Sequence, residues 1–323
     1  MIARGLAWLT ERERSTYGVA VTRIMIGFVV SSQLLLNWFD RSYTWGEGSR
    51  WNETVADIKG YSEFFGLFRS LDGWLWDVAY LIVVLSGIAL MLGVFTRVTT
   101  VTTVILWTSV YVANPYVASG GDAVLRMVLF YLCFTDAGKV WSVDAWLQNR
   151  RGYRVQLAPP WVTATFHNLA VVLMIHQVVM VYVGSALWKV QSPVWRDGTA
   201  VYFPLQTEAY SPWNDLLQPV FANSLFVSGA TYTAMIVQLL FPLLLLYRPT
   251  RMVALVVITG MHLGIGFLMG IMYFSLAMIA VDMMLVSDTS WLRAAGTLRR
   301  WRTLVGRDDL RHAPAGQHEH DDG

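Results

Sequence analysis

The residue most suited to a catalytic role in this 323-residue chain is Lys189, within the stretch SALWKVQSPVWRDG. Two tryptophans, Trp188 and Trp195, lie close to it in the sequence. An amine held in an apolar, aromatic pocket gives up its charge readily and can then act as a general base. A lysine beside tryptophans is also typical of an anchor at the membrane interface. The sequence therefore leaves two interpretations of Lys189 open: a catalytic base and an interface anchor.

Two histidines within apolar segments, His176 and His262, are predicted to line one pocket with Lys189, Trp188 and Trp195. An ionisable group at membrane depth is costly unless it faces a bundle interior or water, so each is a candidate for function. His262 is equally typical of a hydrogen-bonded packing residue. The two histidines lie in different segments, so their spacing predicts no metal site.

Three charged residues inside apolar segments, Arg23, Arg126 and Asp282, are predicted to have structural roles. The two arginines are expected to pair with Asp77 or Asp282 and so to hold helices together. Alternatively, Arg23 and Asp282 extend toward the inner membrane surface, where their charges reach water.

Motifs of the common soluble enzyme classes are absent from the sequence. It contains no Walker loop, dinucleotide fingerprint, HExxH pair or nucleophile elbow. The single cysteine, Cys133, lies within an apolar segment, so the chain has neither a disulfide framework nor a redox motif. Any chemistry must therefore come from the ionisable groups named above.

Eight apolar segments must position these groups, and they predict an all-α polytopic membrane protein with a bundle of about eight transmembrane helices. Hydrophobic residues make up 55% of the chain and charged residues only 14%, too few to cover a soluble protein of this length. A helix needs about 20 residues to cross the hydrocarbon core, and it satisfies its backbone amides internally. The segments 98–114 and 272–287 are short, so six or seven crossings remain an alternative. The eight segments are 17–37, 74–96, 98–114, 122–137, 161–187, 228–247, 250–270 and 272–287.

Lysine and arginine are distributed unequally between alternate loops, and this inequality predicts the orientation. The richer set comprises both termini and the loops around residues 97, 139–154 and 248–251. The positive-inside tendency places this set in the cytoplasm, and we expect a multi-pass protein of the plasma membrane. Basic residues beside helix ends are natural partners of anionic lipid headgroups in the bilayer, and no nucleic-acid binding is expected.

One membrane domain is predicted at residues 15–290, after a short cytoplasmic segment at 1–14. Residues 291–323 form a tail that is basic at first and then polar, and it is predicted to be disordered. The two long outer loops, Asp40 to Asp72 and Trp188 to Phe226, are rich in aromatic residues. This composition predicts that both loops pack over the helix ends.

Several stretches of the chain resemble the vitamin K-dependent gamma-carboxylase family. TDAGKVWSVDAWL (Thr135 to Leu147) resembles the segment that follows a central transmembrane helix in that family. MHLGIGFLMGIMYFSLAMIA (Met261 to Ala280) resembles a second segment, in which His262 and Phe274 follow the family's spacing. The two stretches are fairly specific in combination, whereas each alone is weak.

Two further stretches add to the resemblance. Arg23 with Gly27 resembles the family's opening helix, and the stretch from His176 to Gly198 resembles the one that carries the catalytic lysine, on which Lys189 falls. The resemblance covers residues 15 to 290. Short membrane proteins of this kind form the bacterial HTTM group (horizontally transferred transmembrane domain), which shares the carboxylase's helical domain.

The resemblance implies chemistry linked to a quinone. In the carboxylase, the lysine deprotonates reduced vitamin K, which reacts with oxygen, and the resulting strong base removes a proton from a substrate glutamate before carbon dioxide adds. By this resemblance Lys189 is the base. The loop charges independently predict that Lys189 lies at the extracytoplasmic end of its helix, the side on which the carboxylase works. The implied cofactor is a reduced, lipid-soluble quinone of the vitamin K or menaquinone type, without a metal.

The chain also departs from the family. The carboxylase has a functional histidine just before the helix that leads to WSVD, whereas this chain has SGGDAVLRM (Ser119 to Met127), with Asp122 as the nearest ionisable residue. A large lumenal domain to present glutamates is not expected in this chain, and neither is full glutamate carboxylation. A second interpretation therefore stays open: a non-catalytic maturation or assembly factor for a secreted peptide or a partner membrane protein.

Overall fold

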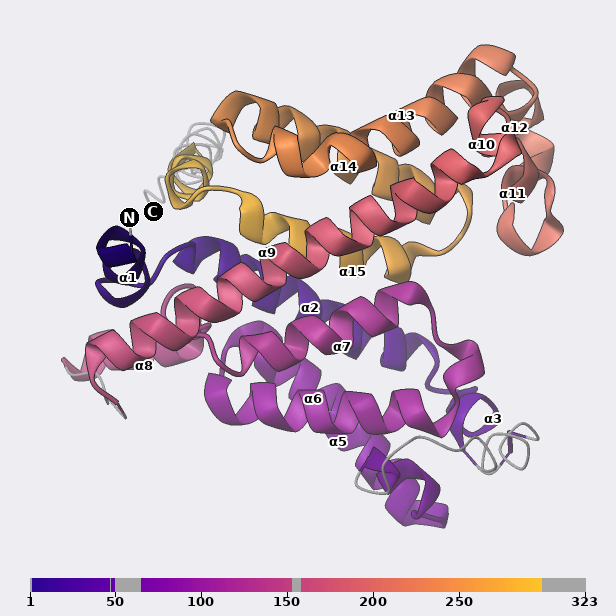
Figure 1. Cartoon of the computed structure of the whole chain (residues 1–323). Helices are drawn as coiled ribbons and strands as arrows, with labels where there is room; N and C mark the ends of the chain where they lie inside the picture. The colour runs from indigo at the N-terminus through magenta and orange to yellow at the C-terminus, as the bar shows by residue number, and fades with distance from the viewer. Residues whose placement is uncertain (1, 47, 50–64, 153–157, 298–323) are drawn as a thin grey trace, which may run out of the picture.

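Every regular element is a helix within the residues that the structure describes, which are 2–46, 48–49, 65–152 and 158–297. In this computed structural model, eight of those helices run back and forth along one axis and form a bundle (Figure 1). They coincide with the eight predicted apolar segments, so the prediction of an all-α fold is confirmed. The bundle helices are α2 (Thr16–Leu36), α5 (Gly73–Leu92), α6 (Thr96–Ala113), α7 (Gly120–Leu132), α9 (Pro160–Gln191), α13 (Ser224–Leu244), α14 (Arg248–Leu268) and α15 (Met272–Asp282).

Not all of these helices meet the requirements for a membrane crossing. In the described part of the chain, five are long and apolar enough: α2, α5, α9, α13 and α14. A sixth crossing results only if Met272–Leu285 and Asp288–Thr297, which are bent by 106°, count as one span. α7 has 13 residues, which at 1.5 Å per residue is about 20 Å and shorter than a hydrocarbon core of about 30 Å. The structure therefore supports a membrane protein with five such helices, or up to six, and the predicted count of eight is not established.

α6 does not meet the hydropathy requirement for a membrane crossing, because it is rich in threonine. Several of its hydroxyls donate to a carbonyl of the preceding turn, as Thr100 does to Thr96 and Thr103 does to Thr99 (both 2.6 Å). These hydroxyls are satisfied within the helix, so α6 tolerates apolar surroundings although its mean hydropathy is low. It packs between α5 and α7 in the bundle.

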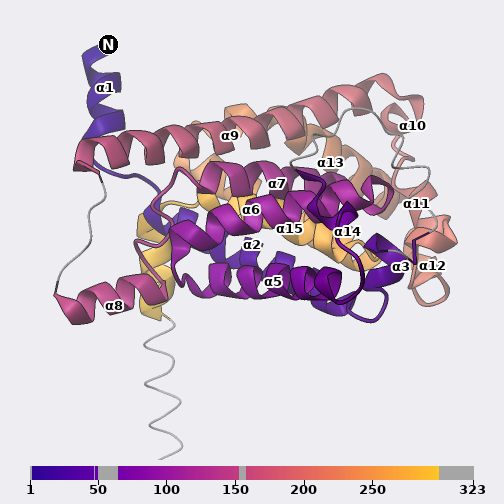
Figure 2. The ribbon, with the colours of Figure 1, turned by 90° about the horizontal axis from the view of Figure 1, so that it is seen from below.

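The loops divide between the two ends of the bundle as the charge distribution predicts. α1 (Ile2–Thr10), α8 (Val143–Arg151) and the beginning of α9 lie at one end (Figures 1 and 2). The last described helix meets the beginning of α2 there, because Asp288 accepts hydrogen bonds from the amides of Thr16 and Tyr17 (3.2 and 2.9 Å). We call this end, where basic residues are abundant, the inner end, and the opposite end the outer end.

The outer end carries the described parts of the two long aromatic loops. Trp45 of the first loop is buried and its ring centroid lies 6.1 Å from that of Tyr80, so this part packs on the helix ends. Residues 50–64 of that loop and the tail from 298 lie outside the described residues, and the predicted disorder of the tail stays a prediction. The short helices of the two loops are α3 (Arg41–Trp45), α10 (Pro193–Arg196), α11 (Tyr202–Gln206) and α12 (Asn214–Phe221).

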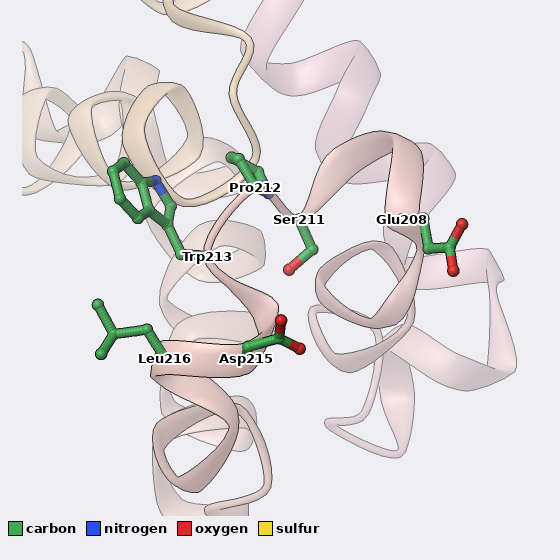
Figure 3. Close-up of a pocket in the computed structure, with 6 residues that line it drawn as sticks. All are labelled: Glu208, Ser211, Pro212, Trp213, Asp215 and Leu216. Atoms are coloured by element: carbon green, nitrogen blue, oxygen red, sulfur yellow. The ribbon is translucent and has the colours of Figure 1, made fainter.

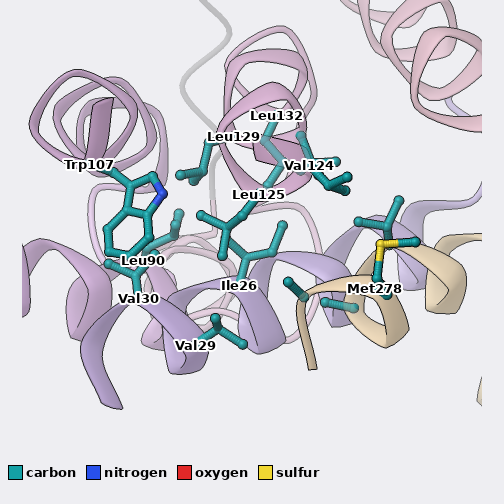
Figure 4. Packing of buried hydrophobic residues seen from close by; sticks show 14 of the residues in the cluster. Ile26, Val29, Val30, Leu90, Trp107, Val124, Leu125, Leu129, Leu132 and Met278 are labelled. Atoms are coloured by element: carbon teal, nitrogen blue, oxygen red, sulfur yellow. The ribbon is translucent and has the colours of Figure 1, made fainter. Parts of the chain in front are cut away.

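The apolar core lies where α2, α5, α6, α7 and α15 meet (Figure 4). Ile26 and Val30 of α2, Trp107 of α6 and Leu125 of α7 are buried there. α15 is the central element, since it contacts α2, α7, α9 and α14. α13 and α14 are less enclosed: 28% of each span is buried, against 56% of α2. A larger part of this pair therefore lies on the surface of the bundle.

α2 and α5 approach each other closely at Gly27. A Cβ atom on Gly27 would lie 2.4 Å from the amide nitrogen of Met91 and 2.7 Å from the carbonyl oxygen of Gly87. Replacing Gly27 with valine should therefore force the helices apart and cost about 1–3 kcal/mol of unfolding free energy. Unfolding in lipid nanodiscs, followed by circular dichroism, measures the loss. Gly184→Val is the control because nothing lies within 4 Å of a Cβ there, and equal losses at both positions would contradict the prediction.

Candidate functional site

A cavity of about 710 Å³ lies toward the outer end of the bundle, between α13, α14 and the loop that carries α10 and α11. Its polar lining is limited to Lys189, Gln238, Thr233 and the indole of Trp195, and the other lining residues are apolar or glycine. Cavities of about 300–1,000 Å³ with apolar walls and a few convergent polar groups are the usual small-molecule sites of proteins. This cavity is therefore the candidate site for a ligand.

Lys189 lies near the end of α9 and contributes the cation of this cavity. Its Nζ donates a 2.9 Å hydrogen bond to Ser185 Oγ and a further hydrogen bond to Gln238 Oε1 of α13. It also lies 4.9 Å from the ring centre of Trp195. Neither of the ion pairs found among the described residues involves Lys189. Its bonded partners are thus neutral, and they hold a charged amine against an apolar space.

Glycines form part of the cavity wall. Gly229 of α13 and Gly260 and Gly264 of α14 line it, and a Cβ atom at any of the three would meet nothing within 4 Å. The GxxxG spacing of Gly260 and Gly264 is typical of close packing between two membrane helices. Here these glycines face open space instead, so the missing side chains provide cavity volume rather than helix contact.

The structure brings Lys189 and Trp195 together at the cavity but leaves three of the predicted pocket residues, Trp188, His176 and His262, outside its lining. Trp188 is 76% exposed and does not line the cavity. Successive residues of a helix point about 100° apart, so Trp188 faces outward where Lys189 faces inward. His176, near the middle of α9, is exposed as well. The expectation that Trp188 and His176 line the pocket is therefore corrected.

His262 lies behind the cavity wall, in a hydrogen-bonded group that we call the buried triad: His262 of α14, Tyr182 of α9 and Asp282 of α15. The Tyr182 hydroxyl donates to Asp282 Oδ2 at 2.7 Å and lies 3.1 Å from His262 Nε2. The exposed fractions of the three residues are 2%, 1% and 0%. The His262 ring contacts Phe274 edge-on, with centroids 5.8 Å apart, and Phe274 lines the cavity. One aromatic ring therefore separates the triad from the cavity.

Three buried polar atoms in and beside the buried triad have no hydrogen-bond partner among the described residues. His262 Nδ1 and Asp282 Oδ1 are both buried without a hydrogen-bond partner among the described residues. Ser275 Oγ, one α15 residue beyond Phe274, is a third such atom. Buried polar atoms are normally paired, and those that are not often mark a functional site rather than a packing contact.

Arg23 binds backbone carbonyls instead of a carboxylate. Its Nη1 donates to the carbonyl oxygens of Leu90 (2.6 Å) and Met91 (2.9 Å), and its Nη2 donates to that of Trp141 (2.6 Å). The carbonyls at the end of a helix lack partners within it, so the guanidinium satisfies the end of α5 and complements its dipole. Arg23 and Asp282 are both 0% exposed, so the predicted contact of their charges with water is wrong.

The predicted pairing of the intramembrane arginines with acidic residues is wrong. Asp77 pairs with Arg41 at 2.8 Å. The guanidinium of Arg126 lies over the ring of Tyr111, 4.2 Å from its centre. Asp282 forms no ion pair within the described residues. The arginines do have structural roles, but carbonyl groups and an aromatic ring are their partners.

The WSVD stretch (Trp141 to Asp144) contacts Arg23 and connects four helices at the inner end. Trp141 supplies the carbonyl that Arg23 binds. Asp144 accepts hydrogen bonds from the amides of Phe95 and Thr96 (2.9 and 2.7 Å) and so caps α6. Ser142 caps α8. The stretch is therefore a structural connection between α2, α5, α6 and α8, and it lies at the end of the bundle opposite to the cavity.

A second pocket, of about 350 Å³, lies in the outer loop at the beginning of α12 (Figure 3). The hydroxyl of Ser211 is buried there without a partner among the described residues, between the exposed carboxylates of Glu208 and Asp215. Trp213 stacks on Phe267 of α14, with centroids 5.1 Å apart, and fastens this loop to the bundle. No motif in the sequence indicated this pocket. Its lining residues are Glu208, Ser211, Pro212, Trp213, Asp215 and Leu216.

The sequence contained signals for the two site residues that were not singled out. Tyr182 precedes Lys189 by seven residues, which is about two helical turns and places both on one face of α9. Gln238 is a polar residue within the apolar segment of α13. A polar group in such a segment is itself a functional signal.

Comparison with known proteins assigns the chain to a family. No solved structure matches the chain. A family model described as the HTTM domain matches residues 12–291, which span the whole bundle from the residues before α2 to the helix after α15. The protein is therefore a membrane protein of the HTTM-domain family.

Proposed function

We propose that the cavity binds an amphipathic, lipid-soluble ligand with one polar head, of the reduced quinone type, and that Lys189 acts on that head as a general base. The observation that carries this proposal is the placement of a single cation, with neutral partners only, in an otherwise apolar cavity. A ring that bears a phenolic hydroxyl offers a proton to an amine and an apolar face to the walls. We place this site on the extracytoplasmic side of the plasma membrane.

The residues of the cavity fit such a ligand. Gln238 offers an amide and Thr233 a hydroxyl for orienting a polar head, and Trp195 offers a flat aromatic surface. The glycines of α13 and α14 leave the remaining wall smooth and apolar, which suits a hydrocarbon tail. A bound reduced quinone would supply the oxygen chemistry, and the protein would supply orientation and the base.

The role of the protein's own residues follows from their contacts. Ser185 and Gln238 fix the Lys189 amine by hydrogen bonds. When the amine is neutral, its lone pair can take a proton from a hydroxyl group in the cavity. The apolar walls limit the access of water and so strengthen each polar contact inside. The chain therefore provides a positioned base in a low-dielectric site.

Filling the cavity should block this function without unfolding the protein. Gly264→Leu adds a side chain where a Cβ meets nothing within 4 Å, so the new group occupies ligand space. We expect ligand affinity to fall at least about tenfold, equivalent to about 1.4 kcal/mol. The assay gives protein in lipid nanodiscs reduced menaquinone in air and measures binding by quenching of tryptophan fluorescence and quinone epoxide by chromatography.

The control for Gly264→Leu is Gly184→Leu, at a glycine that lies outside the cavity and is equally free of contacts. This variant should bind and react as the unaltered protein does. If folded, unaltered protein neither binds the quinol nor forms epoxide, the proposed function is excluded.

A second candidate function, as a maturation or assembly factor, has one observation in its favour. The outer pocket presents the carboxylates of Glu208 and Asp215 beside a buried hydroxyl, and such a surface suits a basic side chain of a secreted peptide or partner protein. In this case Glu208→Gln with Asp215→Asn should abolish co-purification of the partner, and Lys189→Met should not. The opposite pattern would exclude this candidate.

A further inference from the structure

We propose that the buried triad is a proton-storage site, in which Asp282 holds an exchangeable proton and Tyr182 and His262 carry it to and from the cavity. The inference uses the cavity of the proposed function as the place where the proton leaves or enters. It does not depend on which ligand the cavity takes.

The environment of Asp282 favours a stored proton. The carboxyl group is 0% exposed and has a single hydrogen bond, from Tyr182. An ionised carboxylate in apolar surroundings is costly unless a cation or several donors compensate it, so such a group binds a proton instead. Asp282 Oδ1 has no partner among the described residues, so the negative charge of an ionised Asp282 would be only partly compensated.

Among the charged groups on the helices around Asp282, those of α2, α7 and α9 are engaged elsewhere, and Arg248 and Arg251 of α14 form no ion pair within the described residues. On α2, Arg23 is bound to three backbone carbonyls. On α7, Arg126 lies over Tyr111, and Asp122 is bonded to Ser119. On α9, Lys189 is bonded to neutral side chains. None of them forms an ion pair with Asp282, so the carboxyl group has no fixed counter-charge.

The two other members of the triad form a continuous path. When His262 Nε2–H donates to the Tyr182 oxygen (3.1 Å) and the Tyr182 hydroxyl donates to Asp282 Oδ2 (2.7 Å), the hydrogen bonds run in one direction. His262 Nδ1 is then the free end of the path: it has no partner among the described residues, and its ring contacts Phe274 of the cavity wall. Lys189 and Phe274 line the same cavity, so the path ends behind the wall of the cavity that contains the proposed base.

Each transfer balances. A proton that binds His262 Nδ1 releases the Nε2 proton to the Tyr182 oxygen, and Tyr182 passes its own hydroxyl proton to Asp282 Oδ2. The histidine changes tautomer, the tyrosine exchanges one proton for another, and the carboxylate becomes a neutral carboxyl. The reverse steps return the proton to the cavity. In this way the triad, protonated at rest, would deliver its stored proton to a group in the cavity and later take a proton back from it.

Infrared spectroscopy of the full chain in lipid nanodiscs without any quinone tests the inference. At neutral pH we expect the band of a protonated carboxylic acid, which Asp282→Asn removes and Tyr182→Phe shifts because it removes the hydrogen bond. After transfer to D₂O, the rate at which the band shifts reports proton exchange at Asp282. His262→Gln keeps an N–H donor for Tyr182 but does not pass protons readily, and we expect it, like Tyr182→Phe, to slow exchange at least about tenfold.

The matched control is Tyr80→Phe. Tyr80 is another buried tyrosine, on α5, and the change removes the hydrogen bond that its hydroxyl donates to the carbonyl oxygen of Leu34. It should leave the carboxylic acid band and its exchange unchanged. A triad that only holds helices together predicts exchange at the original rate, or faster, in both Tyr182→Phe and His262→Gln. That result, or the absence of a band that Asp282→Asn removes, would overturn the inference. Because no ligand is present, failure here is distinct from failure of quinol turnover.

Discussion

Replacing Arg23 with methionine should strongly destabilise the folded protein in the membrane, although methionine keeps most of the side-chain length. The guanidinium donates three hydrogen bonds, to the carbonyl oxygens of Leu90, Met91 and Trp141, from a fully buried position. Hydrogen bonds to a charged group contribute about 1.5–3 kcal/mol each, and a buried acceptor left unpaired costs about 1–3 kcal/mol. We therefore expect at least about 3 kcal/mol of destabilisation, a large part of a typical stability of about 5–15 kcal/mol.

The matched control is Arg97→Met, an exposed arginine at the same end of the bundle. Its loss should change the unfolding free energy by less than about 0.5 kcal/mol. Unfolding in mixed detergent micelles, followed by tryptophan fluorescence, gives both values. Arg23→Lys should recover only part of the stability, because an ammonium group cannot match the planar fork that reaches three carbonyls. Equal stability of the Arg23 and Arg97 variants would show that the buried hydrogen bonds contribute nothing.

The helices could be predicted from the sequence because the requirement that produces them is local. An apolar segment in hydrocarbon must satisfy its own amides, so each of the eight segments is a helix in the structure. The number of crossings could not be predicted from the same argument. α7 and α15 are 13 and 11 residues long, and each packs against four of the other bundle helices. Length and hydropathy describe a helix that faces lipid, whereas these two are packed on several sides.

The partners of the buried charges could not be predicted either. A sequence shows that Arg23 and Asp282 are costly in an apolar segment, and an ion pair is the simplest way to compensate both charges. The structure compensates Arg23 with carbonyl groups at the end of α5, which are present in every helix and carry no sequence signal. Asp282 is bonded to a tyrosine that lies a hundred residues earlier in the chain. Such contacts follow from how the helices cross.

Part of the candidate site follows from helical periodicity alone. Lys189 and Tyr182 share a face of α9, while Trp188 and His176 lie on exposed faces of the same helix. Applying the 100° rotation per residue separates these two pairs without a structure. The cavity itself does not follow from the sequence, because GxxxG at Gly260 and Gly264 indicates close packing when read alone. Only the three-dimensional arrangement shows that these glycines face open space.

Lys189→Met should abolish turnover of a quinol-type ligand while leaving the fold intact. General acid–base catalysis contributes about 10²–10⁴-fold to a rate, so we expect a loss of that size. Binding should weaken far less, because most of the cavity wall is apolar and does not involve the amine. Single-turnover formation of quinone epoxide and fluorescence titration in nanodiscs measure the two quantities separately.

Lys189→Arg distinguishes a base from an anchor, because the two interpretations predict opposite results for it. Arginine keeps a permanent positive charge and can still lie over Trp195 and donate to Gln238. If Lys189 is only an anchor, the arginine variant should therefore keep its function. A guanidinium does not give up its proton in proteins, so the arginine variant cannot act as a base. We expect the arginine variant to be folded, to bind the ligand and to be as inactive as Lys189→Met. Full activity in either variant would exclude Lys189 as the base and leave the maturation-factor role as the better account of the chain.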